Sequence, residues 1–69
     1  MMYTGRITGV LPHRREFEFV DEVGNKMWGH VSDEIDIWSL YKYIVNKQVV
    51  VCQIEGELTN LLLTKVEEA

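Results

Sequence analysis

Residues 15–31 read REFEFVDEVGNKMWGHV and carry the clearest structural signal in the chain. The first part alternates acidic and aromatic residues: Glu16, Phe17, Glu18, Phe19. This period of two is typical of a β-strand with one buried face, so we expect a strand over residues 15–21. Residues 23–25 predict a hairpin loop, because glycine and asparagine tolerate positive φ. Residues 26–31 alternate again and predict the second strand of the hairpin.

A further strand is expected before this hairpin, over residues 3–11. Its odd positions, with Ile7 as the central one and Leu11 as the last, are predicted to face the core. Gly5 and Gly9 lie inside this strand, where glycine often marks a bulge or a sharp bend. Small barrels need such bends to close, and this favours a rolled-up sheet over a flat one.

The hydrophobic period changes after Asp36. Apolar residues then follow the spacing of one stripe of an α-helix: Ile37, Leu40, Tyr41, Ile44 and Val45. Asp36 suits the N-cap and Asn46 suits the C-terminal end, so a helix over residues 37–45 is predicted. Four residues lie outside the predicted buried stripe: Trp38, Ser39, Lys42 and Tyr43.

Two more strands are predicted after the helix, over residues 48–57 and 58–67. Cys52 shares a strand face with Val50 and Ile54, which predicts that its thiol is a small core group. The chain order is then β-β-β-α-β-β, so we expect a mainly β fold with one helix, closed as a five-stranded antiparallel barrel. This order resembles the OB fold, and the SH3-like barrel is the alternative.

Five segments of the chain carry a second resemblance. They are residues 5–9 (GRITG), 15–19 (REFEF), 24 (G), 29–32 (GHVS) and 49–51 (VVV). Their pattern is similar to that of five-stranded β-barrel domains in bacterial proteins of unknown function. The resemblance spans most of the chain, and it implies a fold rather than an activity.

The length and composition fit one small domain over residues 1–69. The chain weighs 8.1 kDa, with 46% hydrophobic and 26% charged residues, so it has room for one core and none for a cleft between two lobes. It has a single cysteine, and the absence of a disulfide framework favours a reducing cytoplasm. The longest apolar run, residues 49–52, is far shorter than the roughly 20 residues that a membrane span needs.

Catalysis, metal binding and cofactor binding are not expected. The candidate ligands His13, His30 and Cys52 stand far apart and lack the tight pairs of a structural zinc site. A buried Cys52 would not meet substrate, and no serine stands in an evident nucleophile motif. The glycines match neither the dinucleotide-binding pattern nor the phosphate-binding loop. We therefore expect a non-catalytic protein.

Single-stranded nucleic acid is the alternative ligand. On an OB-like barrel the predicted contact residues are Trp28, His30, Arg14 and Arg15, with Trp28 stacking on a base. The net charge of −4 opposes this function, because affinity for nucleic acid depends largely on neutralising phosphates. Glu16 and Glu18 on the neighbouring strand would add local repulsion.

A protein partner, or a second copy in a homodimer, is the expected ligand. The predicted contact residues lie outside the core faces: Trp38, Tyr43, Val49 and Val51. Tryptophan and tyrosine are enriched at the energetic centres of interfaces. Val49 and Val51 would add an exposed apolar patch if no other part of the chain covers them, and such patches mark partner sites. The sequence therefore predicts a protein-interaction module, and no membrane association.

Overall fold

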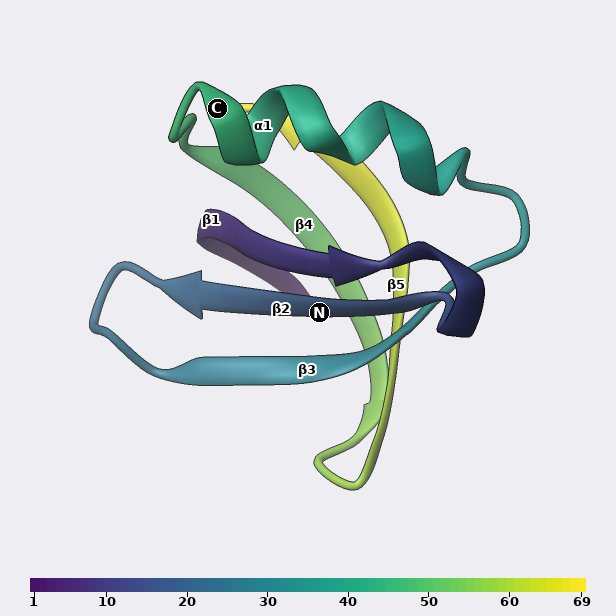
Figure 1. Ribbon diagram of the computed structural model, residues 1–69. Helices are drawn as coiled ribbons and strands as arrows, with labels where there is room; N and C mark the ends of the chain where they lie inside the picture. The colour runs from purple at the N-terminus through teal and green to yellow at the C-terminus, as the bar shows by residue number, and fades with distance from the viewer.

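The computed structural model describes residues 1–69 and shows five strands around one core (Figure 1). The strands are β1 (Met2–Leu11), β2 (Glu16–Asp21), β3 (Lys26–Val31), β4 (Val50–Glu57) and β5 (Asn60–Glu68). A short 3-10 turn, η1 (Pro12–Arg14), joins β1 to β2. The helical segment between β3 and β4 consists of a 3-10 turn, η2 (Ile37–Leu40), and the helix α1 (Tyr41–Val45). This segment lies across one end of the barrel, at the top of Figure 1.

The strands close into a ring in the order β1-β2-β3-β5-β4, so neighbours in the barrel are not all neighbours in the chain. The predicted all-antiparallel barrel is wrong in one pair, because β3 and β5 run parallel. Strand directions can alternate around a closed ring only if the number of strands is even. Five strands therefore require a parallel pair. It falls between β3 and β5 because β4 pairs antiparallel with β1 and β5 returns antiparallel to β4.

The core collects apolar side chains from every strand and from the helical segment. Its twelve buried members are Ile7, Phe17, Phe19, Val31, Ile37, Leu40, Tyr43, Val50, Cys52, Ile54, Leu61 and Leu63. The prediction that Phe17 and Phe19 face inward with Ile7 and Ile54 is confirmed. The inward placement of Cys52 is confirmed as well.

The prediction for the end of β1 is wrong, and a bulge explains the error. The pairing register of β1 and β2 shifts between Ile7 and Gly9, where β1 carries one extra residue. After the bulge the two faces exchange, so Val10 pairs with the buried Phe17 and Leu11 turns outward. The glycines in this strand predict a bend. Which way Leu11 then points is decided by the pairing register with β2.

The helix also differs from its prediction, in the face that it buries. Its first turn is 3-10, with about three residues per turn, so Ile37, Leu40 and Tyr43 fall on one side. An α-helical period from Ile37 onward would instead bury Tyr41 and Val45, which the structure exposes. Tyr43 is only 8% exposed and packs in the core, contrary to the predicted outward position.

Gly29 and Gly5 stand where the backbone of another strand passes very close. A Cβ atom at Gly29 would lie 2.3 Å from the carbonyl oxygen of Leu61 on β5. One at Gly5 would lie 2.1 Å from the carbonyl oxygen of Val20 on β2. Both distances are far below van der Waals contact, so these positions accept only glycine without movement of a strand.

Candidate interaction surfaces

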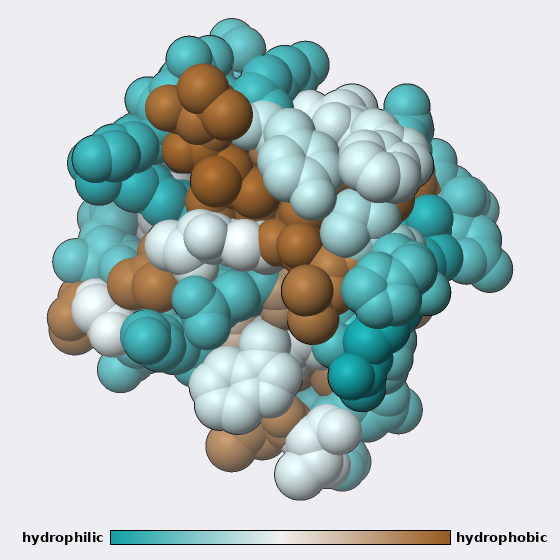
Figure 2. Space-filling view, in the orientation of Figure 1, coloured by the Kyte–Doolittle hydropathy of each residue, from teal (hydrophilic) through white to brown (hydrophobic).

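The outer side of the helical segment carries an exposed row of Trp38, Tyr41 and Val45, which we call the helix face. The Trp38 and Tyr41 rings stack with centroids 5.8 Å apart and planes 20° apart. Asp36 fixes the start of the segment, because its carboxylate accepts a hydrogen bond from the Trp38 backbone N–H at 3.1 Å. In Figure 2 pale and brown surface interrupts the teal polar surface over this segment. The helix face is thus a pre-ordered, apolar and aromatic surface.

The other predicted partner-binding residues do not join Trp38 on this surface. Tyr43 is buried beneath the helix, with the Lys42 ammonium 5.1 Å from its ring centroid. Val49, which is 40% exposed, precedes β4 and lines a shallow recess with Arg6 and other residues of the β1–β2 end. Val51 is half-buried on β4. The sequence analysis missed Tyr41 and Val45 because it assigned both to the buried stripe.

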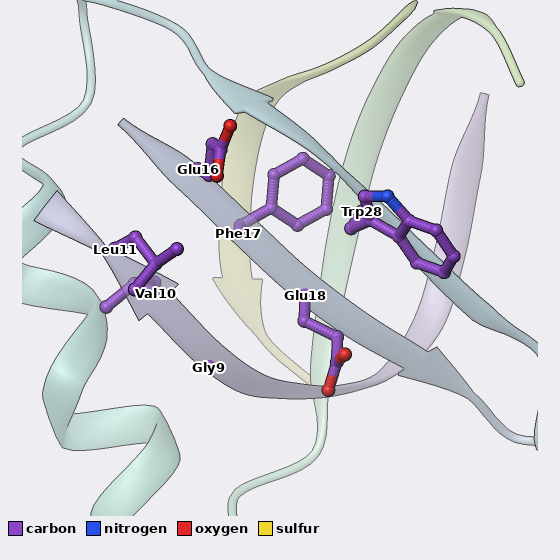
Figure 3. Close-up of a pocket in the computed structure, with 7 residues that line it drawn as sticks. All are labelled: Gly9, Val10, Leu11, Glu16, Phe17, Glu18 and Trp28. Atoms are coloured by element: carbon purple, nitrogen blue, oxygen red, sulfur yellow. The ribbon is translucent and has the colours of Figure 1, made fainter. Parts of the chain in front are cut away.

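Trp28 dominates a second surface, the outer face of β2 and β3. Its side chain is 66% exposed, the same fraction as that of Trp38. Leu11 and Trp28 lie on opposite sides of β2, and Glu16 and Glu18 project between them (Figure 3). Together with Gly9 these residues line a recess of about 460 Å³. Gly9 leaves its floor open, since a Cβ atom there would have no neighbour within 4 Å.

The charges on this second surface largely compensate one another. The Glu16 carboxylate lies 3.4 Å from the Arg14 guanidinium and 3.8 Å from the His30 ring nitrogen, which pairs with it when protonated. The Glu18 carboxylate accepts a hydrogen bond from the Thr8 hydroxyl at 2.8 Å. No strongly basic track therefore runs beside Trp28.

Arg15, a predicted nucleic-acid contact, has a structural role in this fold. Its guanidinium donates hydrogen bonds to the carbonyl oxygens of Ser32 at 2.7 Å and Ile35 at 2.8 Å. It thereby fixes the loop between β3 and η2. The structure thus places Trp28, His30 and Arg14 on or beside one face, while the donors of Arg15 are directed to this loop.

A second recess, of about 600 Å³, opens on the other side of Trp28, between β3 and the β4–β5 turn. Its apolar lining comes from Met27, Trp28, Leu58 and Leu61. Leu58 stands at the tip of the turn with 83% of its surface exposed. Sequence reasoning missed this recess, because it exists only where β3 and β5 diverge in the folded barrel.

Cys52 is the one cysteine of the chain, and its thiol is buried. Burial raises the pKa of the Cys52 thiol to about 12, so this group stays protonated near neutral pH. No three side chains of histidine, cysteine, aspartate or glutamate come together in a group able to hold a metal ion. The exposed surfaces are the candidate functional sites.

No protein-family model, curated protein or solved structure matches this chain. None of its helices has the length and apolar character required to cross a membrane. The candidate functional surfaces of the barrel are therefore three: the helix face, the outer face of β2 and β3, and the recess beside β3.

Proposed function

We propose that this protein is a non-catalytic protein-interaction module on an OB-like barrel, with the helix face as its partner-binding surface. The single observation that carries the proposal is the exposed row of Trp38, Tyr41 and Val45 on the side of the helical segment that faces away from the core. Tryptophan and tyrosine supply much of the binding energy at protein interfaces. Large apolar side chains held on one exposed face are a mark of such interfaces.

The arrangement of the strands supports the OB-like description. The ring order β1-β2-β3-β5-β4 is accompanied by a helical segment between β3 and β4. In an SH3-like barrel the single helical turn usually stands between the last two strands. Here a tight turn at Leu58 and Thr59 joins these two strands.

The spacing within the helix face indicates what kind of partner fits it. Trp38, Tyr41 and Val45 stand at positions i, i+3 and i+7, the pattern with which an amphipathic helix enters an apolar groove of another protein. The stacked rings of Trp38 and Tyr41 already have a fixed relative orientation, so less side-chain entropy is lost on binding. We therefore expect a partner, or a second copy of the chain, that presents a complementary apolar groove.

The test compares Trp38 with an exposed apolar residue outside the proposed surfaces. Trp38→Ala should weaken binding of the partner about thirtyfold, the effect of losing one interface hot spot. Met2→Ala removes another exposed apolar side chain, one outside all the proposed surfaces, and is the control that should leave the affinity unchanged. Light scattering at increasing concentration detects a homodimer, and quantitative capture from lysate with both variants detects another partner. A strict monomer that retains no protein, or equal losses for the two variants, would contradict the proposal.

A second candidate function is binding of single-stranded nucleic acid on the outer face of β2 and β3. The observation that favours it is the exposed Trp28 between two recesses, on the face where OB-like barrels stack bases. Glu16, Glu18 and the net charge of −4 oppose it. In a Trp38→Phe variant, an oligothymidylate that binds there would quench the fluorescence of Trp28, less so at high salt. The absence of quenching at low salt would eliminate this candidate.

A further inference from the structure

Half of β3 has no strand on its second side. On its first side it pairs with β2 from Lys26 to His30. On its second side it pairs with β5 only at His30 and Val31. Figure 1 shows that β3 begins at the β2–β3 turn and reaches β5 only toward its end, while the β4–β5 turn points in another direction. Residues 26–28 therefore form a free edge of the sheet, which we call the β3 edge.

The backbone groups on the β3 edge can be assigned from the ladder with β2. Val31 N–H donates to the Arg15 carbonyl at 2.8 Å, and Asp21 N–H donates to the Asn25 carbonyl at 3.0 Å. In an antiparallel ladder every second residue bonds to the partner strand, and the residues between point their N–H and C=O groups to the other side. The backbone N–H and C=O groups directed to β2 are thus those of residues 25, 27, 29 and 31. The N–H and C=O groups of Lys26 and Trp28 are directed away from it, where no strand meets them.

We infer that an extended peptide segment of a partner protein adds to the β3 edge as a further strand. Such a strand would pair with the two free N–H and two free C=O groups of Lys26 and Trp28, as in other cases of strand addition. It would lie about 4.8 Å from β3, beside the recess that separates β3 from the β4–β5 turn. The inference rests on the proposed role in protein interaction but not on the helix face.

The side chains at the edge indicate the chemistry of the peptide. Lys26 is exposed and takes part in none of the ion pairs of the chain, so its charge is complementary to an acidic side chain directly opposite. Trp28 points to the same side of the sheet, two residues further, and favours an aromatic or β-branched side chain opposite. The alternate side chain of the peptide would contact Met27 and Leu58 in the recess. The peptide is therefore an apolar strand with one acidic residue two positions from an aromatic one.

Direct evidence would come from hydrogen exchange of the two free amides. The probe is a seven-residue synthetic peptide of threonine and valine that carries an aspartate and a tyrosine two positions apart. A counterpart of reversed order is used as well, because the added strand can run in either direction. At saturation one of them should slow the exchange of the Lys26 and Trp28 amides about tenfold or more and leave the amides of α1 unchanged. If neither peptide slows these two amides, the inference is wrong.

A charge exchange tests the predicted pairing without removing the edge. Lys26→Glu should weaken binding of the aspartate peptide about two- to fivefold, and a peptide with lysine in place of aspartate should regain the loss. Lys42→Glu on α1 is the matched control and should change neither affinity. Equal affinities of wild type and Lys26→Glu for both peptides would overturn the assignment of Lys26. A second variant, Lys26→Pro, removes a free N–H at the first residue of a strand, where proline is tolerated, and should weaken binding about threefold to tenfold.

The two proposed surfaces can fail separately. Loss of the partner in Trp38→Ala, combined with unchanged exchange at Lys26 and Trp28 on addition of either peptide, would overturn the β3 edge site alone. Slowed exchange at these amides, with partner binding unaffected in Trp38→Ala, would overturn the helix face alone. Oligothymidylate that quenches Trp28 while neither peptide changes the exchange would replace the peptide with a nucleic acid as the ligand of this region.

Discussion

Two strands of the barrel, β1 and β3, each lack a neighbouring strand over part of their length. The two free edges differ in what packs against them. β1 pairs with β4 only over Met2–Gly5, so its remaining half lacks a strand on that side. The helical segment packs on β1 and contributes Ile37 and Leu40 to the core. The β3 edge has no such cover. Free edges promote aggregation unless they are covered or charged, and Lys26 supplies the charge at the β3 edge. The β1 edge is thus packed against the helical segment, whereas the first half of the β3 edge has no strand beside it.

The largest expected effect is a difference in the free energy of unfolding between a substitution under the helical segment and one beside the β3 edge. Leu40 is buried under the helical segment, so Leu40→Ala should lower the free energy of unfolding by about 2–5 kcal/mol. Leu58, beside the β3 edge, is exposed, and Leu58→Ala should change it by less than about 0.5 kcal/mol. Urea denaturation monitored by circular dichroism measures both values. Equal losses would mean that the β4–β5 turn packs on β3 and that the edge is closed.

A smaller effect is expected at the point where the open edge begins. Gly29→Ala would press a methyl group against the Leu61 backbone, which should cost about 1–3 kcal/mol and push β5 away from β3. The exchange of the His30 amide should then become faster, since the unpaired part of β3 lengthens. Gly9→Ala is the matched control, because its methyl group meets open space, and we expect a change below about 0.5 kcal/mol. A tolerated Gly29→Ala would show that the contact between β3 and β5 is loose.

The smallest effect concerns the hairpin turn that presents the β3 edge. The Asp21 carboxylate accepts hydrogen bonds from the backbone N–H groups of Asn25 and Val23, and the bond from Asn25 is the main reason that its pKa is lowered. A lowered pKa means that this contribution to stability is present above the ordinary value of 3.8 and is lost as the pH falls through the pKa of the folded protein. Acid should therefore loosen the turn before the core unfolds.

An NMR titration checks the acid effect by following the Asp21 carboxyl and the Asn25 amide together. Asp21→Asn should remove the pH dependence of the Asn25 amide exchange relative to that of a core amide such as Phe19. A carboxyl that titrates above 3.8 would contradict the hydrogen bonds in the turn. Because the carboxylate is exposed, the global stability should hardly respond.

Local patterns in the chain predicted most of the elements and part of the core. Alternation identified the strand with Phe17 and Phe19, and the change of period after Asp36 located the helical segment. Predictions of the buried face failed at two places where the regular period of an element is interrupted. A bulge against β2 turned Leu11 outward, and a 3-10 first turn exchanged the places of Tyr41 and Tyr43.

The candidate surfaces were predictable to a lesser degree. Trp38 and Trp28 were identified from the sequence, because aromatic residues outside a buried periodicity are visible in it. The stacking partner Tyr41 was not identified from the sequence, since its exposure depends on which face of the helical segment is buried. The β3 edge was not identified from the sequence either, since a free edge results from the pairing of distant segments rather than from any one segment.

The sequence alone determined which segments are strands and which one is helical, because apolar periodicity and turn residues act over a few neighbouring positions. Tertiary structure decided that one strand pair is parallel, since a ring with an odd number of strands cannot alternate in direction. It also decided which strand edge the helical segment covers. Both properties arise only when the ring closes, because they depend on the pairing of segments that are distant in the chain.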